Sequence, residues 1–402
     1  MKGAIWLIFL VCAAAAPVKI ELTHVDDVTT GYATFQSHNQ KVLSNRGGIF
    51  MTHLRSQNEP YTAQQWRLSR STDGGKTFAT VFETASGTHP PCIETDEDDN
   101  VYLVRSEFAD GNAYLHTFRA ADGYDPAKAR VTPIPHGAAQ KFGMYYDLRR
   151  GQLYYASHHR FDVIGLDGAV RNSVKLLQWG KNAEMQYPIL AVDASGVLYF
   201  AWTTVPFGKM TYRSIHFMRS PDAGATWQNP DGSPLTAPIV ADDTGPAHRV
   251  NLDDELDESN WLSSFRTRDG KAHFLYLSTV NPPRQHYVRY DLKTAKRDLD
   301  LHPTFKGESI ELRGLDGFFA ASDKTLYCVG HTPDGRVGCL ASDDNGATWR
   351  DHALSDPLEG LYAVGGARDV SGDGSVIGSF TQILTAGGGI RVCFLRIPAH
   401  AK

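Results

Sequence analysis

The chain lacks several features that mark common classes of protein. It carries 40 Lys and Arg residues against 45 Asp and Glu, a formal net charge of −5, and no dense basic run. That balance argues against a nucleic-acid-binding protein. No apolar stretch is long enough to cross a bilayer, so no membrane span is expected. Helical periodicity is absent over any long window, which excludes a helical fold.

Turn residues and apolar residues are plentiful instead. The 402 residues include 37 Gly and 20 Pro, and 42% of them are hydrophobic and 11% aromatic. So many turn residues do not suit a helical protein, while the apolar content is sufficient for a large core. The composition therefore favours a chain built from many short strands.

The first residues predict an export signal. Lys2 precedes the apolar run Ala4–Val11, and small residues follow up to Ala16. A short positive region, a short apolar run and small residues at the cleavage site are typical of a secretory signal peptide. We therefore expect a signal peptide at residues 1–16, a mature chain at 17–402, and a secreted or periplasmic location.

One eight-residue pattern, Ser-x-Asp-x-Gly-x-Thr-aromatic, occurs at Ser71–Phe78, Ser220–Trp227 and Ser342–Trp349. The Asp carboxylate can accept bonds from nearby backbone N–H groups, the Gly tolerates positive φ, and the aromatic ring can pack under a neighbouring strand. Each copy therefore predicts a hairpin turn, and three distant copies predict a repeated unit. The pattern resembles the Asp-box of sialidase-like β-propellers, which braces blades and very rarely touches substrate.

A second repeat consists of an apolar strand, a short turn and a returning apolar strand that carries Tyr or Phe. Its copies are His38–Met51, His89–Val104, Phe142–Ala156, Tyr187–Phe200, Leu262–Leu275, Leu315–Val329 and Gly365–Gly378. Each inner hairpin with an outer pair of strands makes one blade, so we expect an all-β, seven-bladed β-propeller of four-stranded antiparallel blades in one domain. Val18–Thr23 is expected to close the ring against Arg391–Ile397.

Further segments resemble one group of enzymes. They are Phe35–Val42, Ala201–Thr204, His273–Tyr276, Arg284–Asp291 and Leu315–Ala320. The chain resembles, over nearly all of its mature length, the seven-bladed propeller enzymes that remove L-rhamnose from α-1,4-linked glucuronate at arabinogalactan chain ends. That group is related to the propeller ulvan lyases. The resemblance implies a monomeric enzyme that acts on an acidic oligo- or polysaccharide without a cofactor; a structural metal ion stays possible.

The chemistry is expected at the rim of the channel, where the inner strands begin. Hydrolysis of a glycoside normally needs two carboxylic groups about 5 Å or about 6.5–9.5 Å apart, and the predicted rim offers only Glu107 and Asp316, on distant blades. β-Elimination from a 4-linked uronate needs a cation at the C6 carboxylate and a His or Tyr for proton transfer. The rim therefore favours a lyase. An α-L-rhamnosidase and a non-catalytic glycan-binding propeller are the alternatives.

The resemblance implies roles for the rim residues of blades 2 and 3. His89 is expected to be the leading base or acid, and Arg160 the clamp for the carboxylate. His158 and His159 would be second proton-transfer or binding groups, although strand alternation would send their rings to opposite faces. Ser106–Phe108 stands where related lyases carry a second His. Both residues could instead have purely structural roles: His89 could cap a strand, and Arg160 could form an ion pair on the surface.

Four further residues complete the expected site. Tyr145 or Tyr187 would protonate the leaving oxygen, with Tyr187 also able to bind substrate or to wedge two blades apart. His38 is the competing catalytic residue, since some members of the group were assigned a lone His near the start of the chain. Arg249 would help to bind an acidic sugar.

The cysteines leave three alternatives open. Cys328 and Cys339 flank the turn Thr332–Gly335, so they could form a disulfide, remain as buried thiols, or join a His in a zinc site. The acidic run Asp253–Glu258 does not match an EF-hand loop, and we expect it to be a solvated loop.

Overall fold

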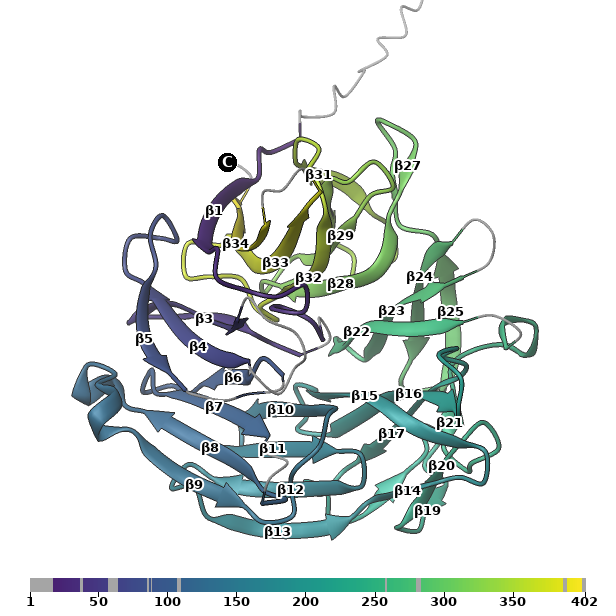
Figure 1. Cartoon of the computed structure of the whole chain (residues 1–402). Coiled ribbons are helices and arrows are strands. Elements are labelled where there is room, and N and C mark those ends of the chain that lie inside the picture. Colours follow the sequence, from purple (N-terminus) through teal and green to yellow (C-terminus); the bar gives the residue numbers. More distant parts are fainter. Residues whose placement is uncertain are drawn as a thin grey trace, which may run out of the picture.

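Seven antiparallel sheets stand around a central axis like the blades of a propeller (Figure 1). The computed structural model describes residues 17–36, 39–56, 64–84, 87, 89–106, 110–256, 259–279, 283–385 and 389–399. Both the predicted signal peptide and His38 lie outside these ranges. Within them, no helix combines the length and the apolar character that a membrane crossing requires. The fold is all-β and seven-bladed, as the sequence predicts.

Blades 1 to 4 follow the order of the sequence, and the inner strand of each is the first named. Blade 1 consists of β2 (Val42–Asn45), β3 (Gly48–Arg55), β4 (Gln65–Ser71) and β5 (Ala79–Glu83). Blade 2 consists of β6 (Cys92–Thr95), β7 (Val101–Ser106), β8 (Ala113–Phe118) and β9 (Arg130–Ile134). Blade 3 consists of β10 (Phe142–Asp147), β11 (Gln152–Ser157), β12 (Arg160–Gly165) and β13 (Val170–Lys175). Blade 4 consists of β15 (Ala183–Val192), β16 (Leu198–Pro206), β17 (Ile215–Ser220), β18 (Trp227–Gln228) and β19 (Pro234–Leu235), with β21 (His248–Arg249) also paired to β17.

Blades 5 to 7 complete the circle. Blade 5 consists of β22 (Asn260–Arg268), β23 (Lys271–Ser278), β24 (Arg284–Asp291) and β25 (Lys296–Leu301). Blade 6 consists of β28 (Arg313–Ala321), β29 (Leu326–His331), β30 (Val337–Ser342) and β31 (Arg350–Leu354). Blade 7 consists of β32 (Leu361–Gly366), β33 (Val376–Leu384), β34 (Gly389–Ile397) and β1 (Glu21–Asp26). Short pieces outside the blades are β14 (Leu177–Trp179) with β20 (Ile239–Ala241), β26 (Thr304–Phe305) with β27 (Ile310–Glu311), and the 3₁₀ turns η2 (Ala120–Asp122), η3 (Pro126–Lys128) and η4 (Asp253–Glu255).

The ring is closed by the two ends of the chain. Strand β1 pairs antiparallel with β34, with Glu21 opposite Arg396 and an ion pair of 2.7 Å between their side chains. The closing strand begins three residues later than Val18, because the backbone N–H of Val18 bonds instead to the carbonyl of His352 in blade 6 (2.8 Å). Since closure covers the free edge of β34, the disc has no open edge at this joint.

The three Asp-boxes lie at the turns between the third and fourth strands of blades 1, 4 and 6. In the first of them, Oδ1 of Asp73 accepts the N–H groups of Lys76 and Thr77, both at 3.0 Å. Ser71 Oγ accepts the N–H of Gly75 at 2.8 Å. These bonds hold the turn, and the box touches no part of the central channel.

The four described cysteines are buried free thiols, the second of the three alternatives that the sequence left open. Cys328 packs in the apolar layer between blades 5 and 6, and Cys339 in the layer between blades 6 and 7. In the register of the two strands Cys328 lies opposite Leu340, so the Cys328 and Cys339 side chains point to opposite faces of the blade. The same alternation rules out a shared metal.

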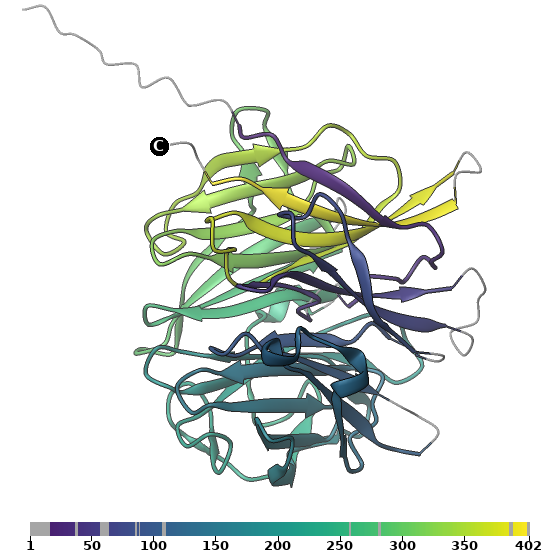
Figure 2. The ribbon, with the colours of Figure 1, turned by 90° about the vertical axis from the view of Figure 1, so that its left-hand side faces the viewer.

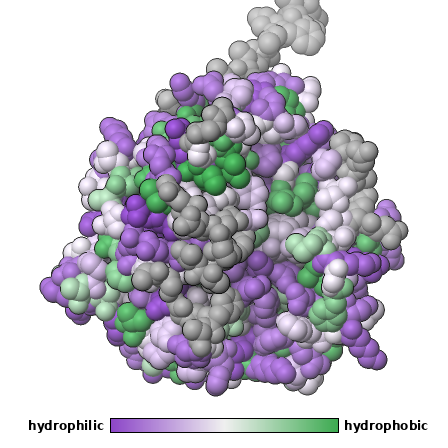
Figure 3. All heavy atoms as spheres, viewed as in Figure 1, coloured by the Kyte–Doolittle hydropathy of each residue, from purple (hydrophilic) through white to green (hydrophobic). Residues whose placement is uncertain are grey.

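The disc has two faces that differ in what they expose. We call the face at which the inner strands begin, and the second strands end, the start face. Because the third strand of a blade runs in the same direction as the first, the Asp-box turns lie on the opposite face. Figure 2 shows the disc from the side, and Figure 3 shows a largely hydrophilic face with hydrophobic groups gathered in few places.

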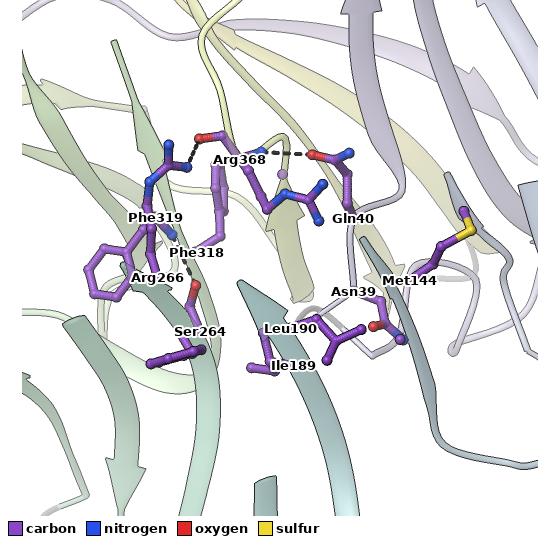
Figure 4. Close-up of a pocket in the computed structure, with 13 residues that line it drawn as sticks. Asn39, Gln40, Met144, Ile189, Leu190, Ser264, Arg266, Phe318, Phe319 and Arg368 are labelled. Carbon is purple, nitrogen blue, oxygen red and sulfur yellow. Dashed lines mark hydrogen bonds between the residues drawn. The ribbon is translucent and has the colours of Figure 1, made fainter. Parts of the chain in front are cut away.

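Polar side chains link the blades across the channel. The backbone N–H of Arg368, after β32, donates to Oε1 of Gln40, before β2, at 2.9 Å. Arg266 of β22 donates to the Arg368 carbonyl and, at 2.7 Å, to Asp369. Figure 4 shows a pocket near the axis that Arg368 and Gln40 line from neighbouring blades, together with Asn39 and Arg266. Blades 1, 5 and 7 are therefore joined near the axis by direct hydrogen bonds.

Candidate active site

Chemically useful side chains gather on the start face of blades 2, 3 and 4. His89 precedes β6, and Lys141 stands directly before β10. His158 and His159 occupy the turn between β11 and β12, and Tyr187 lies within β15. Burial, and after it the positive charge of Lys141 among others, lowers the pKa of both His89 and His158.

His89 is half-buried and uncharged at neutral pH. Burial, followed by the charges of Lys141, Lys41 and His158, lowers its pKa to about 3. A neutral imidazole has a nitrogen lone pair that can accept a proton. An anion bound beside Lys141 would offset the ammonium charge and raise the pKa of His89 toward the range in which a general base works well.

His158 and His159 lie on the same side of the chain, contrary to the alternation expected for a strand. The reason is that β11 ends at Ser157 and β12 begins at Arg160, so the pair sits in a turn. The two ring centroids are 6.4 Å apart, and both rings contact Trp179, His159 at 5.0 Å and His158 at 6.5 Å. Burial, then the neighbouring charges of His159 and Lys141, lowers the pKa of His158 to about 4.

Lys141 is one of two lysines whose charge acts on His89, and the sequence argument overlooked it. Its ammonium lies 4.9 Å from the ring centroid of Tyr187 and 5.4 Å from that of Phe35. Burial lowers its pKa to about 8, while the charge of Glu184 acts in the opposite direction. The sequence could have indicated Lys141 as a rim residue, because it adjoins Phe142, one of the predicted blade starts.

Tyr187 lies at a break in the strand pairing. The register of β15 with β16 shifts between Gln186 and Ile189, and Tyr187 has φ of +53°, an unusual conformation for a side chain of this size. The ring is 2% exposed and packs 4.2 Å from Trp261, and its hydroxyl lies 3.1 Å from that of Tyr212. Burial raises the pKa of Tyr187, so the phenol stays neutral and its ring supports the Lys141 ammonium.

Glu184 is a second residue that the sequence argument missed. It lies on β15, its charge acts on both Lys141 and His159, and its Oε1 accepts a bond from Gln186 at 2.6 Å. Of the two carboxylates expected at the rim, Glu107 lies outside the described residues, and Asp316 is buried and accepts the backbone N–H of Ala363. Glu184 therefore balances the charge of Lys141.

Three residues of the predicted site, Arg160, Tyr145 and Arg249, have their contacts outside the group formed by His89, Lys141, His158 and His159. One nitrogen of Arg160, Nη2, bonds to Ser173 and reaches Asp162 at 3.5 Å, an ion pair within blade 3. Its Nε has no partner among the described residues.

Tyr145 and Arg249 are likewise placed elsewhere. The ring of Tyr145 lies under the guanidinium of Arg368, at 4.1 Å, and lines a cavity of about 320 Å³ that also contains Glu94 and the turn after β6. That turn belongs to the face opposite the start face. Arg249, on the extra strand β21 of blade 4, bonds to Asp253 and to the carbonyl of Asn251 (3.0 Å).

Among the described residues, one group of side chains in and beside blade 5 has metal-ligand geometry. The ligand atoms of Glu255, His286 and Asp300 lie within 4.8 Å of one another in blade 5 and the turn before it. Arg297 already bonds to Glu255 at 3.3 Å and to Asp300 at 2.7 Å. Because that guanidinium supplies the balancing positive charge, the group is stable as an ion-pair cluster. The acidic run begins with the turn η4, where the Glu255 carboxylate accepts the N–H of Leu252 at 2.9 Å.

Comparison with known proteins supports the architecture. A sequence model of a family described as BNR repeat-containing matches residues 144–309, from blade 3 into the segment after blade 5. No curated protein matches the chain. An ulvan lyase from a new polysaccharide lyase family superposes with a TM-score of 0.64 at 11% identity, over 92% of this chain and 94% of that one.

Two further solved structures share the fold. The polysaccharide lyase Uly1 superposes with a TM-score of 0.60 at 13% identity, over 90% of each chain. An endosialidase of phage phi92 gives 0.52 at 11% identity, over 96% of this chain and 70% of that one. The superpositions establish a common fold. Because the identities are this low, the chemistry must be argued from the site itself. By fold, the chain is similar to the propeller-shaped ulvan lyases.

Proposed function

We propose that this chain is a glycan-degrading enzyme, a polysaccharide lyase that removes L-rhamnose from the 4-position of a terminal glucuronate. The observation that carries the proposal is a half-buried ammonium, Lys141, held over the rings of Phe35 and Tyr187 on the start face. Two imidazoles, His89 and His158, lie on the same face in blades 2 and 3. A uronate has a carboxylate that can pair with Lys141 and an acidic C5–H that an imidazole can deprotonate. Arabinogalactans and gum-arabic-like glycans would supply this substrate, and the predicted export signal fits an extracellular polymer.

The reaction balances without water or a cofactor. Lys141 pairs with the C6 carboxylate and stabilises the negative charge that spreads into it as the C5 proton leaves. His89 accepts that proton, the C4–O4 bond breaks, and a C4=C5 double bond forms. The imidazolium of His89 returns that proton to O4, so the imidazole is neutral again at the end of the reaction. The products are free rhamnose and an unsaturated uronate.

The roles differ from those expected from the sequence at one point. Lys141 takes the place of Arg160 as the carboxylate clamp, because Arg160 is engaged with Asp162 and Ser173. Tyr187 becomes a positioning residue that holds the ammonium through its ring. A lysine is a compact point charge, so it neutralises the carboxylate without the bidentate geometry of an arginine.

One assay separates the proposal from its alternatives. Rhamnosyl-glucuronate is incubated with the protein while free rhamnose and the ultraviolet absorbance of the new conjugated double bond are followed together. Both signals rising in step support elimination. Rhamnose without absorbance identifies a hydrolase, and neither signal leaves a binding propeller.

Two substitutions then test the assigned residues. His89→Ala should lower kcat by roughly 10²- to 10⁴-fold, the usual contribution of a general base. Lys141→Met should lower kcat/KM by roughly 10²- to 10³-fold, as expected when one partner of a desolvated charge pair is removed. The loss in Lys141→Met should shrink on the methyl ester of the substrate, which has no carboxylate charge.

The controls are matched by residue type. His24→Ala alters an exposed histidine on β1, and Lys128→Met an exposed lysine on η3. Both should retain full activity. Equal losses in Lys141→Met on the free acid and on the ester would disprove the clamp, and an active His89→Ala would disprove the base.

A further inference from the structure

A row of exposed aromatic rings leads away from the histidine pair across the start face. Trp179 and Phe207 are each 45% exposed, although side chains of this kind are usually buried. The ring of His159 lies 5.0 Å from Trp179, and Trp179 lies 6.0 Å from Phe207. The three rings therefore form a continuous path from the site of proton transfer toward blade 4.

The row is held in place by backbone contacts. The carbonyl of His159 accepts the N–H groups of Leu176 and Leu177, at 2.7 and 3.2 Å, which fixes the start of β14 to the histidine turn. Trp179, at the other end of β14, is paired with Ala241 of β20. The N–H of Phe207 donates to the carbonyl of Asn182 at 2.9 Å. A binding surface built on such fixed backbone loses little entropy when it takes up a ligand.

Gly180 allows the close approach that this arrangement requires. A Cβ at Gly180 would overlap the side chain of Asp242, which follows β20. The chain can therefore turn directly after Trp179, with the N–H of Gly180 donating to the carbonyl of Ala183 at 3.0 Å, and enter the inner strand of blade 4.

Exposed lysines flank the row, while the carboxylates nearest to it are the buried Asp242 beside Gly180 and Glu184, whose charge acts on His159. Lys181 and Lys209 are exposed and lie two residues beyond Trp179 and Phe207, respectively. Positive charge beside flat aromatic faces suits a glycan that carries uronate groups and presents the apolar C–H face of a pyranose ring.

We propose that Trp179 and Phe207 form a stacking subsite for a neutral pyranose, the sugar to which the reacting glucuronate is attached. The proposal rests on the proposed function for the identity of the reacting group, and adds the recognition of the glycan beyond it. A terminal rhamnose needs only a closed pocket, whereas the rest of the polymer must leave the site. An open row of rings that starts at the histidines provides that path.

The test measures binding separately from catalysis. Arabinogalactan oligosaccharides with and without the terminal rhamnosyl-glucuronate are titrated calorimetrically into the His89→Ala protein. In that background Phe207→Ala should raise the Kd of both oligosaccharides about tenfold, the size of one good aromatic contact. It should change the Kd of the disaccharide rhamnosyl-glucuronate much less, because the disaccharide does not reach Phe207.

The control is another exposed apolar residue of the same loop. Met210 is 84% exposed, and Met210→Ala should leave the Kd of every ligand unchanged. Trp179→Phe keeps a ring in the row and should retain oligosaccharide binding while the fluorescence change on binding is lost.

The outcomes separate the two proposals. Binding of the uncapped oligosaccharide that Phe207→Ala weakens, without any cleavage of the capped one by the unsubstituted protein, would reject the lyase and keep the subsite. Unaltered binding in Phe207→Ala, an equal loss for the disaccharide, or no binding of either oligosaccharide would reject the subsite.

Discussion

The Asp-box glycines provide a stringent test of how the blades pack. Gly75 has φ of +92°, and a Cβ there would overlap the ring of Phe394, with two further ring carbons at 2.9 and 3.0 Å. Its neighbour Gly74 has φ of +77°, and nothing lies within 4 Å of the corresponding Cβ. The two residues share one turn and one backbone region, so they differ mainly in what their side chains would meet.

The expected magnitudes follow from that difference. Gly74→Ala should cost about 1–2 kcal/mol of unfolding free energy, the usual penalty for an L-residue in the left-handed region. Gly75→Ala should cost the same amount plus about 1–3 kcal/mol for overpacking against Phe394. The ring cannot move away freely, because it is 1% exposed and packs 5.1 Å from Phe78 of the same Asp-box.

The measurement is urea denaturation of both variants beside the unsubstituted protein, with thermal unfolding as a second readout. At about 2.1 cal/mol/K per residue, each kcal/mol should shift Tm by only about 1 °C in a chain of this length, so the denaturant midpoint is the sharper observable. Repeating Gly75→Ala in a Phe394→Ala background should remove the overpacking part and leave the left-handed penalty. Equal costs for Gly74→Ala and Gly75→Ala would show that blades 1 and 7 do not pack as described.

Two other predictions concern buried titratable groups. Burial lowers the pKa of His116, His216 and His273 to about 3, about 4 and about 3. Below the ordinary histidine pKa of about 6.5, the folded state therefore binds fewer protons at these three residues than the unfolded state does. As the pH is lowered below that value, the free energy of unfolding should decrease by up to about 4 kcal/mol per pH unit. Urea midpoints at pH 7 and pH 5 measure this, and equal midpoints would contradict it. Burial also raises the pKa of the Cys328 and Cys339 thiols, so under non-reducing conditions both should react with a thiol reagent only after unfolding; a pair still blocked after unfolding would reveal a disulfide.

The fold could be predicted because its unit is local and repeated. Each Asp-box turn is held by side chains within four residues of its Asp, and each inner hairpin carries its own turn residues, so spacing along the chain is sufficient to count blades. The closing strand was also predicted, since β34 leaves a free edge that another strand must cover. Its first residue was misjudged because the Val18 N–H bonds to His352 in blade 6, a contact with no local signal.

The candidate site proposed from the structure differs from the one expected from the sequence, and the differences have a common origin. The rule that blade starts face the channel located His89, and the turn after β11 located His158 and His159. The same rule applies to Lys141, whose proposed role is suggested only by its position beside the rings of Phe35 and Tyr187. Arg160 was chosen for its charge, but its partner Ser173 lies on the next strand of its own blade.

By itself the sequence determined the repeated unit, the number of blades and the faces to which residues near strand ends belong. These properties depend on short-range hydrogen bonds, on turn geometry and on the alternation of side chains along a strand. Only the tertiary structure decided which charges stand together, which imidazoles stay neutral, and where aromatic rings remain open to a ligand. Burial and Coulomb forces act through space, between groups separated by tens of residues or more, so no local pattern records them.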